Sequence, residues 1–372
     1  MEFRDLKKQY HVLKEDMDKA ILDAVASGAY IMGQPVRELE KQLAEYVGVK
    51  HCLTCANGTD ALTLALKAWG IGPGDAVFVP DFTFFSSAEV VPLEGAEPVF
   101  VDVCEETFNL DAADLDRAVA QVVAEGRLRP RVVVAVDLFG LPADYKAIRA
   151  VADKYGLLIL EDGAQGFGGT IDGKRACSFG DIATTSFFPA KPVGCYGDGG
   201  AVFTDNDEWA ALIESYRVHG KGQFKYDNVR IGMNSRLDTV QAAVLQVKLK
   251  AFDEYELGDI NLAALQYTKR LKDIVATPVI PEGFLSSWAQ YTLRLRDKAQ
   301  RDALQAALKA EGIPSMVYYP KPMHLQTAFA GLTRNLCPVA TSLCDRVLSL
   351  PMHPYLTADQ IDTVCDAIRK AL

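Results

Sequence analysis

The sequence predicts an α/β protein with a mainly parallel sheet. Short apolar runs rich in β-branched residues are flanked by Gly, Pro and Asp, which is typical of buried strands. Segments with the apolar spacing of helices lie between them, and this alternation favours parallel strands connected by helices. The strand-like runs cover residues 76–79, 98–102, 131–138, 157–160, 182–188 and 200–204.

Helical patterns account for most of the remaining chain. An amphipathic helix is expected over residues 11–27, and a second one over 35–47, with Pro35 near its start. From about residue 255 the chain mixes helices with strand-like pieces at 289–295 and 315–318. The other expected helices cover residues 60–69, 86–94, 111–121, 144–155 and 239–252.

The length of 372 residues suggests more than one domain. The alternating strands and helices extend to about residue 250, and the pattern changes beyond it. We therefore expect a large domain over residues 16–250 and a smaller C-terminal α+β domain over 251–372. Residues 1–15 are expected to pack on the smaller domain.

Composition excludes several classes of function. The formal net charge is −10, which disfavours non-specific binding to nucleic acid or to an anionic membrane surface. The charged N-terminal segment lacks the apolar core of a signal peptide, and no stretch approaches the roughly 20 apolar residues of a membrane span, so a cytoplasmic protein is expected. The CxxC spacing of Cys52 and Cys55 has no second pair, so we expect free thiols and no metal site.

Charged residues follow two predicted strands within residues 157–204. Glu161 and Asp162 fall at the C-terminal end of the strand at 157–160, where open α/β sheets place their ligand sites. A carboxylate there can hold a ring nitrogen protonated, although an ordinary acidic turn residue fits too. Lys191 lies just beyond the strand at 182–188, among small and apolar residues. Desolvation there would lower the lysine pKa and free the amine for imine formation, whereas a lysine in a flexible surface loop is the alternative.

Two further motifs follow earlier strands. The NGTD sequence at 57–60 opens a helix, whose free N–H groups and dipole make a phosphate site, although a plain helix cap explains the same residues. Phe82, Phe84 and Phe85 follow another strand. An aromatic ring there can stack on a planar group, although core packing is the alternative.

These motifs resemble the DegT/DnrJ/EryC1/StrS family of nucleotide-sugar aminotransferases, which are fold-type-I enzymes dependent on pyridoxal phosphate. The resemblance extends from about residue 5 to SLPMHPYLT at 349–357. It implies a seven-stranded sheet, pyridoxal 5′-phosphate as the cofactor with a pyridoxamine phosphate form, and a homodimer with active sites at its interface. The matching segments are NGTDAL at 57–62, FTFFSSAEVV at 82–91, EDGAQGFGG at 161–169, SFGDIATTSFFPAKPVGCYGDGGA at 178–201 and GMNSRLD at 232–238.

The resemblance implies roles for residues around the cofactor ring. Lys191 matches the lysine that forms the Schiff base, and Asp162 matches the partner of the pyridinium nitrogen. Gln165 matches the side chain near the ring hydroxyl, and Phe84 occupies the ring-stacking position.

The resemblance also implies how the cofactor phosphate is held. Gly58, Thr59, the backbone of Asp60 and Ser186 match the family's phosphate contacts. Asn234 matches a residue that reaches the phosphate from the neighbouring subunit.

Within the family, SFFPAKPVGCYGDGG and NSRLD are most similar to the UDP-2-acetamido-2-deoxy-3-oxo-glucuronate aminotransferases, which make a 3-amino sugar for surface polysaccharide. This similarity implies that L-glutamate donates the amino group, leaving as 2-oxoglutarate, and that UDP-2-acetamido-2-deoxy-3-oxo-D-glucuronate accepts it. Arg236 of the neighbouring chain would contact the substrate carboxylate. The alternative acceptor is a dTDP- or UDP-linked 3-keto- or 4-keto-6-deoxyhexose.

One motif departs from this branch of the family. The branch carries a His-Tyr-Pro step where this chain has Tyr318, Tyr319 and Pro320. Both tyrosines are candidates for substrate contact, and packing is the alternative for each. The sequence leaves open whether His219, His324 and His353 line the pocket or have structural roles.

Three competing functions fit the sequence less well. Sugar dehydratases of the family carry His where this chain has Lys191. An NAD-dependent oxidoreductase would need GxGxxG directly after an early strand, and the glycine run at 166–169 is not placed there. A regulator with this fold would need a DNA-binding module, for which the chain has no spare residues and the wrong charge.

Overall fold

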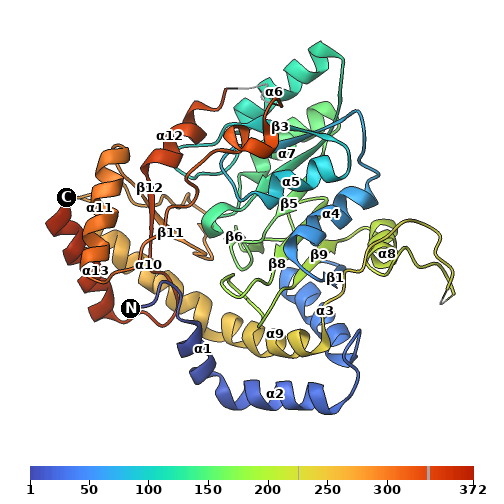
Figure 1. Ribbon diagram of the computed structural model, residues 1–372, viewed down its shortest axis with the longest axis horizontal. Coiled ribbons are helices and arrows are strands. Elements are labelled where there is room, and N and C mark those ends of the chain that lie inside the picture. Colours follow the sequence, from blue (N-terminus) through green and yellow to red (C-terminus); the bar gives the residue numbers. More distant parts are fainter. Residues whose placement is uncertain (225, 333–335) are drawn as a thin grey trace.

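A seven-stranded sheet forms the centre of the molecule (Figure 1). The computed structural model describes residues 1–224, 226–332 and 336–372. Strand order is β1-β9-β8-β5-β4-β2-β3, and β9 runs antiparallel to both neighbours whereas the other adjacent pairs are parallel. The predicted mainly parallel sheet is therefore confirmed. Its strands are β1 (His51–Cys55), β2 (Asp75–Pro80), β3 (Glu97–Val101), β4 (Arg129–Val136), β5 (Leu158–Asp162), β8 (Ile182–Ser186) and β9 (Gly200–Thr204).

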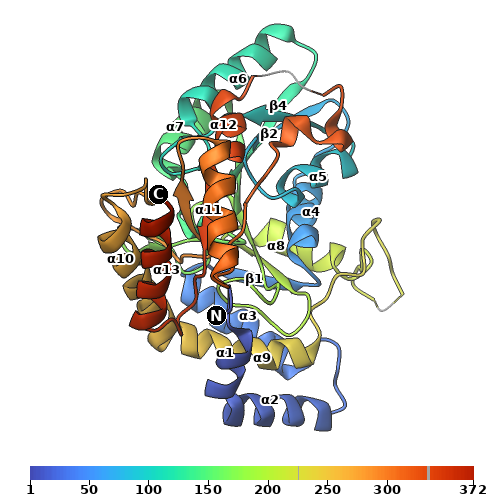
Figure 2. The same ribbon diagram turned by 60° about the vertical axis from the view of Figure 1, so that its left-hand side comes forward.

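Helices cover both faces of this sheet (Figures 1 and 2). None of the helices within the described ranges is both long and apolar enough to cross a membrane. Several begin with a side-chain cap, such as Asn57, Asp111 and Asp144, which accept hydrogen bonds from free backbone N–H groups. The helices before residue 252 are α1 (Leu6–Val12), α2 (Lys14–Ala26), α3 (Gln34–Val47), α4 (Gly58–Ala68), α5 (Ser86–Leu93), α6 (Ala112–Glu125), η1 (Leu138–Gly140), α7 (Tyr145–Tyr155), α8 (Asp207–Tyr216) and α9 (Thr239–Ala251).

Strand β4 shows how the two faces are filled. Successive side chains of a strand point to opposite faces, so Val132 and Val134 join the apolar cluster that includes α4. Val133 and Ala135 join the cluster formed by α6 and α7 on the other face. A near-continuous apolar strand is what a parallel sheet covered on both faces requires.

The C-terminal part has an apolar cluster of its own, built from α10, α11, α13 and the β11–β12 pair. Residues 323–332 and 336–347 nevertheless return to the central sheet, where Met323 and Leu343 join the α4 cluster. The division into domains at residue 250 stays a prediction, because α9 continues through the π-helical turn η2 into α10. The remaining elements are η2 (Phe252–Glu256), α10 (Leu257–Leu271), α11 (Lys298–Ala310), η3 (Met323–Leu325), η4 (Thr327–Phe329), α12 (Pro338–Arg346), α13 (Ala358–Ala371), β6 (Thr170–Ile171), β7 (Lys174–Arg175), β10 (Phe284–Leu285), β11 (Tyr291–Arg294) and β12 (Val347–Leu350).

Two expected elements differ from the structure. The helix expected over 11–27 is divided at Leu13, which leaves the helical conformation and packs its side chain against the cluster beneath α3 and α9. The expected strand at 315–318 is an extended segment with a single bridge between Met316 and Ser349. Pro314 and Pro320 flank that segment, and proline cannot donate to a strand ladder.

The N-terminal segment lies against the C-terminal part of the chain (Figures 1 and 2). The carbonyl of Phe3 accepts a hydrogen bond of 3.1 Å from the Met352 N–H. The Phe3 ring also meets Tyr318 edge-on, with ring centroids 6.2 Å apart. Whether residues 1–15 belong to a separate small domain stays a prediction.

Candidate active site

A cavity of about 440 Å³ lies where β5 and β8 end and α4 begins. Parallel strands of an open α/β sheet end at one edge, and ligands bind outside that edge. The cavity brings together most of the residues expected from the sequence. They are Gly58, Thr59, Phe84, Asp162, Gln165, Ser186, Lys191, Tyr318 and Tyr319.

Lys191 is held in a turn just beyond β8. Its backbone N–H donates to the Phe188 carbonyl at 2.8 Å. A side chain at Gly194 would meet the Phe188 and Pro189 carbonyls within 2.6 Å, so only glycine fits against this turn. Burial lowers the pKa of Lys191 to about 8, although the Asp162 carboxylate opposes that shift. About a tenth of this amine is therefore neutral at pH 7, far more than for an ordinary lysine, and the neutral form is the nucleophile.

Asp162 ends β5 and faces the same cavity. Its Oδ2 atom accepts a hydrogen bond of 2.7 Å from the Ser87 hydroxyl, and its Oδ1 atom accepts one of 3.2 Å from the Ala164 N–H. Ser87 in turn lies 3.1 Å from the Thr83 hydroxyl. These contacts fix the orientation of the carboxylate, which is what a partner for a ring nitrogen requires.

Glu161, the neighbour of Asp162, points the other way. Strand alternation sends it into the interior, where its carboxylate accepts hydrogen bonds from the Phe179 and Gly180 N–H groups at 2.7 and 2.9 Å. Burial raises the pKa of Glu161, and burial together with Glu161 raises the pKa of Asp137 beside it. The strand therefore separates one acid that faces the cavity from another that is structural.

The start of α4 forms the opposite end of the cavity. Asn57 caps the helix by accepting from the Asp60 N–H at 2.8 Å, so that N–H is already used. Asp60 itself does not line the cavity. The Thr59 and Ser86 hydroxyls lie 2.9 Å apart. A Cβ at Gly58 would lie 2.7 Å from the Ser186 Cβ, so glycine lets β8 approach the helix start closely.

Gln165 is nearly buried, and both ends of its amide are engaged. Its Oε1 atom accepts from the Phe139 N–H at 2.7 Å, and its Nε2 atom donates to the Tyr319 hydroxyl at 2.9 Å. The Tyr319 ring lies 6.1 Å from the Phe84 ring, and Phe84 is half exposed at the cavity. An exposed aromatic face beside a cavity can stack on a planar ligand.

The cavity suits a flat ring that carries a phosphate. The Lys191 amine and the Asp162 carboxylate supply the two functional groups that pyridoxal phosphate chemistry needs, and Phe84 supplies an aromatic surface. Glycine, hydroxyls and a helix start supply the neutral donors of a phosphate site. The residues present therefore fit this cofactor.

Comparison with known proteins decides the family. The model of the DegT/DnrJ/EryC1/StrS aminotransferase family matches residues 11–369. The chain belongs to this family. Its members named below are aminotransferases, so the predicted class of enzyme is confirmed.

Two relatives cover nearly the whole chain. UDP-2-acetamido-2-deoxy-3-oxo-D-glucuronate aminotransferase of Pseudomonas aeruginosa is 45% identical over 369 residues, with 99% of each chain covered. UDP-N-acetyl-3-dehydro-alpha-D-glucosamine 3-aminotransferase of Acidithiobacillus ferrooxidans is 41% identical, with 99% of this chain and 97% of its own covered. Both names describe amino transfer to a UDP-sugar.

Solved structures of this aminotransferase family show the same fold. A DegT DnrJ EryC1 StrS aminotransferase from Brucella abortus has a TM-score of 0.97 and 50% identity, covering 100% of this chain and 99% of its own. NtdA from Bacillus subtilis, solved with bound cofactor PMP, has a TM-score of 0.87 and 27% identity, covering 96% of this chain and 82% of its own. The expected fold type is confirmed.

Three residues assigned from the family resemblance lie outside the cavity of this chain. They are Asp60, described above, and the pair Asn234 and Arg236. The Arg236 guanidinium donates to the Asn234 amide oxygen at 2.6 Å, and Asn234 is exposed. Their expected roles at a neighbouring subunit's site stay predictions.

The candidate histidines and the CxxC cysteines lie outside the cavity. His324 Nδ1 lies 2.6 Å from the buried Asp81 carboxylate, and neither His219, His324 nor His353 lines the cavity. Cys52 and Cys55 are buried free thiols in β1, and burial raises the pKa of Cys55 to about 12.

The sequence interpretation assigned no role to several residues at the site. Ser87 lies within the FTFFSSAEVV motif, in the first turn of α5, and its hydroxyl contacts that of Thr83. Gln290 lines the cavity from the C-terminal part, and its buried Oε1 has no hydrogen-bond partner among the described residues. Arg4 donates to the carbonyl of Lys191 over a separation of 187 residues, which no local pattern could indicate.

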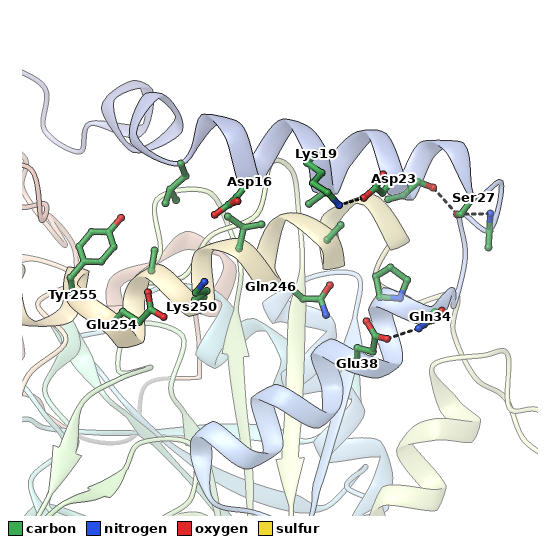
Figure 3. Close-up of a pocket in the computed structure, with 18 residues that line it drawn as sticks. Asp16, Lys19, Asp23, Ser27, Gln34, Glu38, Gln246, Lys250, Glu254 and Tyr255 are labelled. Atoms are coloured by element: carbon green, nitrogen blue, oxygen red, sulfur yellow. Dashed lines mark hydrogen bonds and ion pairs between the residues drawn. The ribbon is translucent and has the colours of Figure 1, made fainter.

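A second hollow is larger than the active-site cavity but chemically different (Figure 3). It has a volume of about 760 Å³ and lies between α2, α3 and α9. Acidic side chains such as Asp16, Asp23, Glu38 and Glu254 surround it. None of the expected site residues lines it, so the chemistry of the lining and not the volume identifies the active site.

Proposed function

We propose that this aminotransferase moves the amino group of L-glutamate to a UDP-linked 3-keto sugar, and that its acceptor is UDP-2-acetamido-2-deoxy-3-oxo-D-glucuronate. The observation that carries the proposal is a single cavity in which the Lys191 amine and the Asp162 carboxylate face the same space. The names of the two relatives described above support a UDP-3-keto sugar as the acceptor.

Lys191 is proposed as both the anchor and the proton carrier. Bound pyridoxal phosphate supplies an electron sink for the electrons released when the donor loses its Cα proton. Lys191 would hold the cofactor covalently as its anchor. Once freed by the amino donor, its amine would accept the donor Cα proton and later return a proton to the acceptor carbon of the sugar. The lowered pKa of about 8 suits an amine that must both accept and donate a proton.

The other residues hold the cofactor in place. Asp162, oriented by Ser87, keeps the ring nitrogen protonated, which makes the ring a stronger electron acceptor. Phe84 would cover one face of the ring, and Gln165 would lie near the ring hydroxyl, because both residues line the cavity. Thr59 and the Gly58 backbone at the start of α4 would hold the phosphate together with Ser186 at the end of β8, whereas the Asp60 N–H already donates to Asn57.

The tyrosines are proposed to meet the sugar. Tyr318 and Tyr319 enter the cavity from the C-terminal part, opposite the strand ends. Burial raises the pKa of the Tyr318 hydroxyl, so it stays protonated and can donate a hydrogen bond to a sugar oxygen. Tyr319 is held by Gln165, which links the position of the sugar to that of the cofactor.

A homodimer is proposed to complete the site. Beyond α8 a surface arm described over residues 219–224 and 226–232 carries exposed apolar side chains, among them Phe224 and Ile231, which are 73% and 90% exposed. Large apolar side chains at such exposure favour burial against a partner. The arm leads directly to Asn234 and Arg236, so docking it on a second copy would bring Arg236 of the partner subunit to the substrate carboxylate.

Subunit mixing tests this dimer. Lys191→Ala and Arg236→Ala chains are each expected to be inactive alone. If the partner supplies Arg236, a mixed dimer has one intact site, and an equal mixture should regain roughly a quarter of wild-type activity. A mixture that stays inactive after subunit exchange has been demonstrated would contradict the shared site.

The absorption spectrum of the full-length protein with pyridoxal phosphate tests the chemistry. Lysine-bound cofactor should absorb at about 410–430 nm, and L-glutamate should replace that band with one at about 330 nm. Lys191→Ala should show neither the first band nor the conversion. A wild-type band that ignores L-glutamate would contradict the proposed donor.

A panel of acceptors tests the sugar. The loaded enzyme is offered the UDP-3-keto-glucuronate, the matching 3-keto sugar without the carboxylate, and dTDP-4-keto-6-deoxyglucose, and return of the 410–430 nm band is followed. The first should react fastest. Equal rates with and without the carboxylate would contradict the uronate, and a preference for the dTDP sugar would support the alternative acceptor.

A further inference from the structure

An arginine near the start of the chain contacts the main chain of the proposed anchor lysine. The Nη2 atom of Arg4 donates to the Lys191 carbonyl at 2.8 Å and lies 3.5 Å from the Pro192 carbonyl. The Lys191 N–H is engaged within its own turn by Phe188. The backbone N–H of Lys191 is therefore fixed within its own turn, and its carbonyl is held by a residue 187 positions away.

Arg4 lies close to a group of buried titratable residues. Glu256 in η2 is the carboxylate that faces it, and Lys248, Tyr355 and His353 are the other titratable groups close enough to interact. Glu256 accepts hydrogen bonds from the Gln9 amide at 3.0 and 3.1 Å, and from the Tyr355 hydroxyl. This group joins the N-terminal segment, η2 and the C-terminal part beside the Lys191 turn.

The charge of Arg4 also acts on the Lys191 amine. Two charged groups face that amine, namely Asp162 from β5 and Arg4 from the N-terminal segment. Asp162 favours the protonated amine, whereas the guanidinium disfavours it, and burial acts in the same direction as the guanidinium. The Arg4 Nη1 atom is buried without a hydrogen-bond partner among the described residues, so little water surrounds this charge to screen it.

We propose that Arg4 is a positioning residue for the amino-transfer reaction. It holds the carbonyl of Lys191, and so fixes the backbone from which the reacting side chain extends. Its positive charge also increases the neutral fraction of the amine. The proposal rests on the proposed role of Lys191, and it concerns a residue of the N-terminal segment that makes no contact with the cavity itself.

Chemical labelling of Lys191 tests the charge effect without cofactor. The full-length chain is acetylated with acetic anhydride across a series of pH values, and the Lys191 peptide is quantified by mass spectrometry. Wild-type Lys191 should be half reactive near pH 8. Removing a nearby positive charge raises a lysine pKa, so Arg4→Met and Arg4→Gln should move the midpoint up by about half a pH unit.

Two matched variants separate this effect from a general loosening of the N-terminus. Arg4→Lys keeps the charge and should recover at least half of the shift. Gln9→Met removes the hydrogen bonds to Glu256 from the same segment but leaves Arg4 in place, so it should not move the midpoint. An unchanged midpoint in both neutral Arg4 variants, or an equal shift in Gln9→Met, would overturn the proposal.

The second measurement is the rate at which the protein binds pyridoxal phosphate. At pH 7.5 the neutral Arg4 variants should bind the cofactor about threefold more slowly, as half a pH unit implies. A wild-type chain that never binds the cofactor would count against the proposed function, while the labelling midpoint would still decide the role of Arg4.

Discussion

The active site contains two groups of residues that are held in different ways. The strand-end group comprises Thr59, Asp162, Ser186 and Lys191, each within a few residues of a strand end or a helix start. The terminal group comprises Arg4, Tyr318 and Tyr319, which reach the same region from outside residues 57–191. Backbone hydrogen bonds of the sheet, of α4 and of the turn beyond β8 hold the first group, whereas individual side-chain contacts hold the second.

This difference predicts how substitutions act. A change in the strand-end group removes a reacting or binding function but leaves the scaffold in place. A change in the terminal group alters how accurately those functions are aligned, so its effects should be smaller and should respond to pH or temperature. Four measurements test this comparison.

The largest effect is expected for Asp162→Asn. The amide retains the size of the side chain but cannot stabilise a protonated ring nitrogen, so the single-turnover rate with L-glutamate should fall by about 100- to 1000-fold. Ser87→Ala, which removes one hydrogen bond to this carboxylate, should cost roughly tenfold. A loss of less than threefold in Asp162→Asn would show that the carboxylate has no role in the chemistry.

Acid should weaken the contacts of the terminal segments. His353 is buried, and burial lowers its pKa to about 4, from about 6.5 in an unfolded chain. Between these values the unfolded chain binds the proton and the folded chain does not, so stability falls as pH falls through that window, by roughly 2 kcal/mol at pH 4.5. Urea unfolding at pH 6.5 and 4.5 should show this loss, and His353→Gln should lose less. Equal losses in both proteins would rule out this histidine as the cause.

Gly58→Ala should act on the phosphate end of the cavity. The added methyl would lie 2.7 Å from the Ser186 Cβ, so β8 and the start of α4 must separate. Overpacking of this kind costs about 1–3 kcal/mol, and the cofactor dissociation constant should rise about tenfold or more in a spectroscopic titration. Gly72→Ala, where an added Cβ meets nothing closer than 3.8 Å, is the control. Unchanged cofactor affinity in Gly58→Ala would contradict the close approach.

The smallest effect is expected for Tyr319→Phe. Loss of the hydroxyl removes the hydrogen bond from Gln165 but keeps the ring beside Phe84. One such bond contributes about 1 kcal/mol, so kcat/KM for the sugar should fall by about fivefold, mostly through KM. The half-reaction with L-glutamate should change less. A larger loss in that half-reaction would place Tyr319 with the strand-end group.

The strand-end group was predictable because its signals are local. Alternation of strands and helices placed Asp162 and Lys191 at the edge of a parallel sheet, and the structure gathers both at one cavity. The terminal group was only partly predictable, since Tyr318 and Tyr319 were candidates through family resemblance alone. Arg4 carried no signal, because its partner is 187 residues away.

The pair Glu161 and Asp162 shows where local reasoning stops. Period-two alternation says that the two acids face opposite sides of the strand, but it does not say which side is the cavity. Packing decides this: backbone N–H groups after β7 enclose Glu161, while Ser87 from α5 reaches Asp162. The same packing selects one of two adjacent carboxylates for the chemistry.

The sequence by itself determined the fold class, the aminotransferase family and the residues that end each strand, because periodicity and motifs depend on neighbours along the chain. Only the tertiary structure decided which contacts hold Asp162 toward the cavity and Glu161 away from it, what holds Gln165 and Tyr319, and that Arg4 reaches the Lys191 carbonyl. Such contacts join distant segments. Their geometry depends on how apolar clusters bring helices and strands together, which no short stretch of sequence specifies.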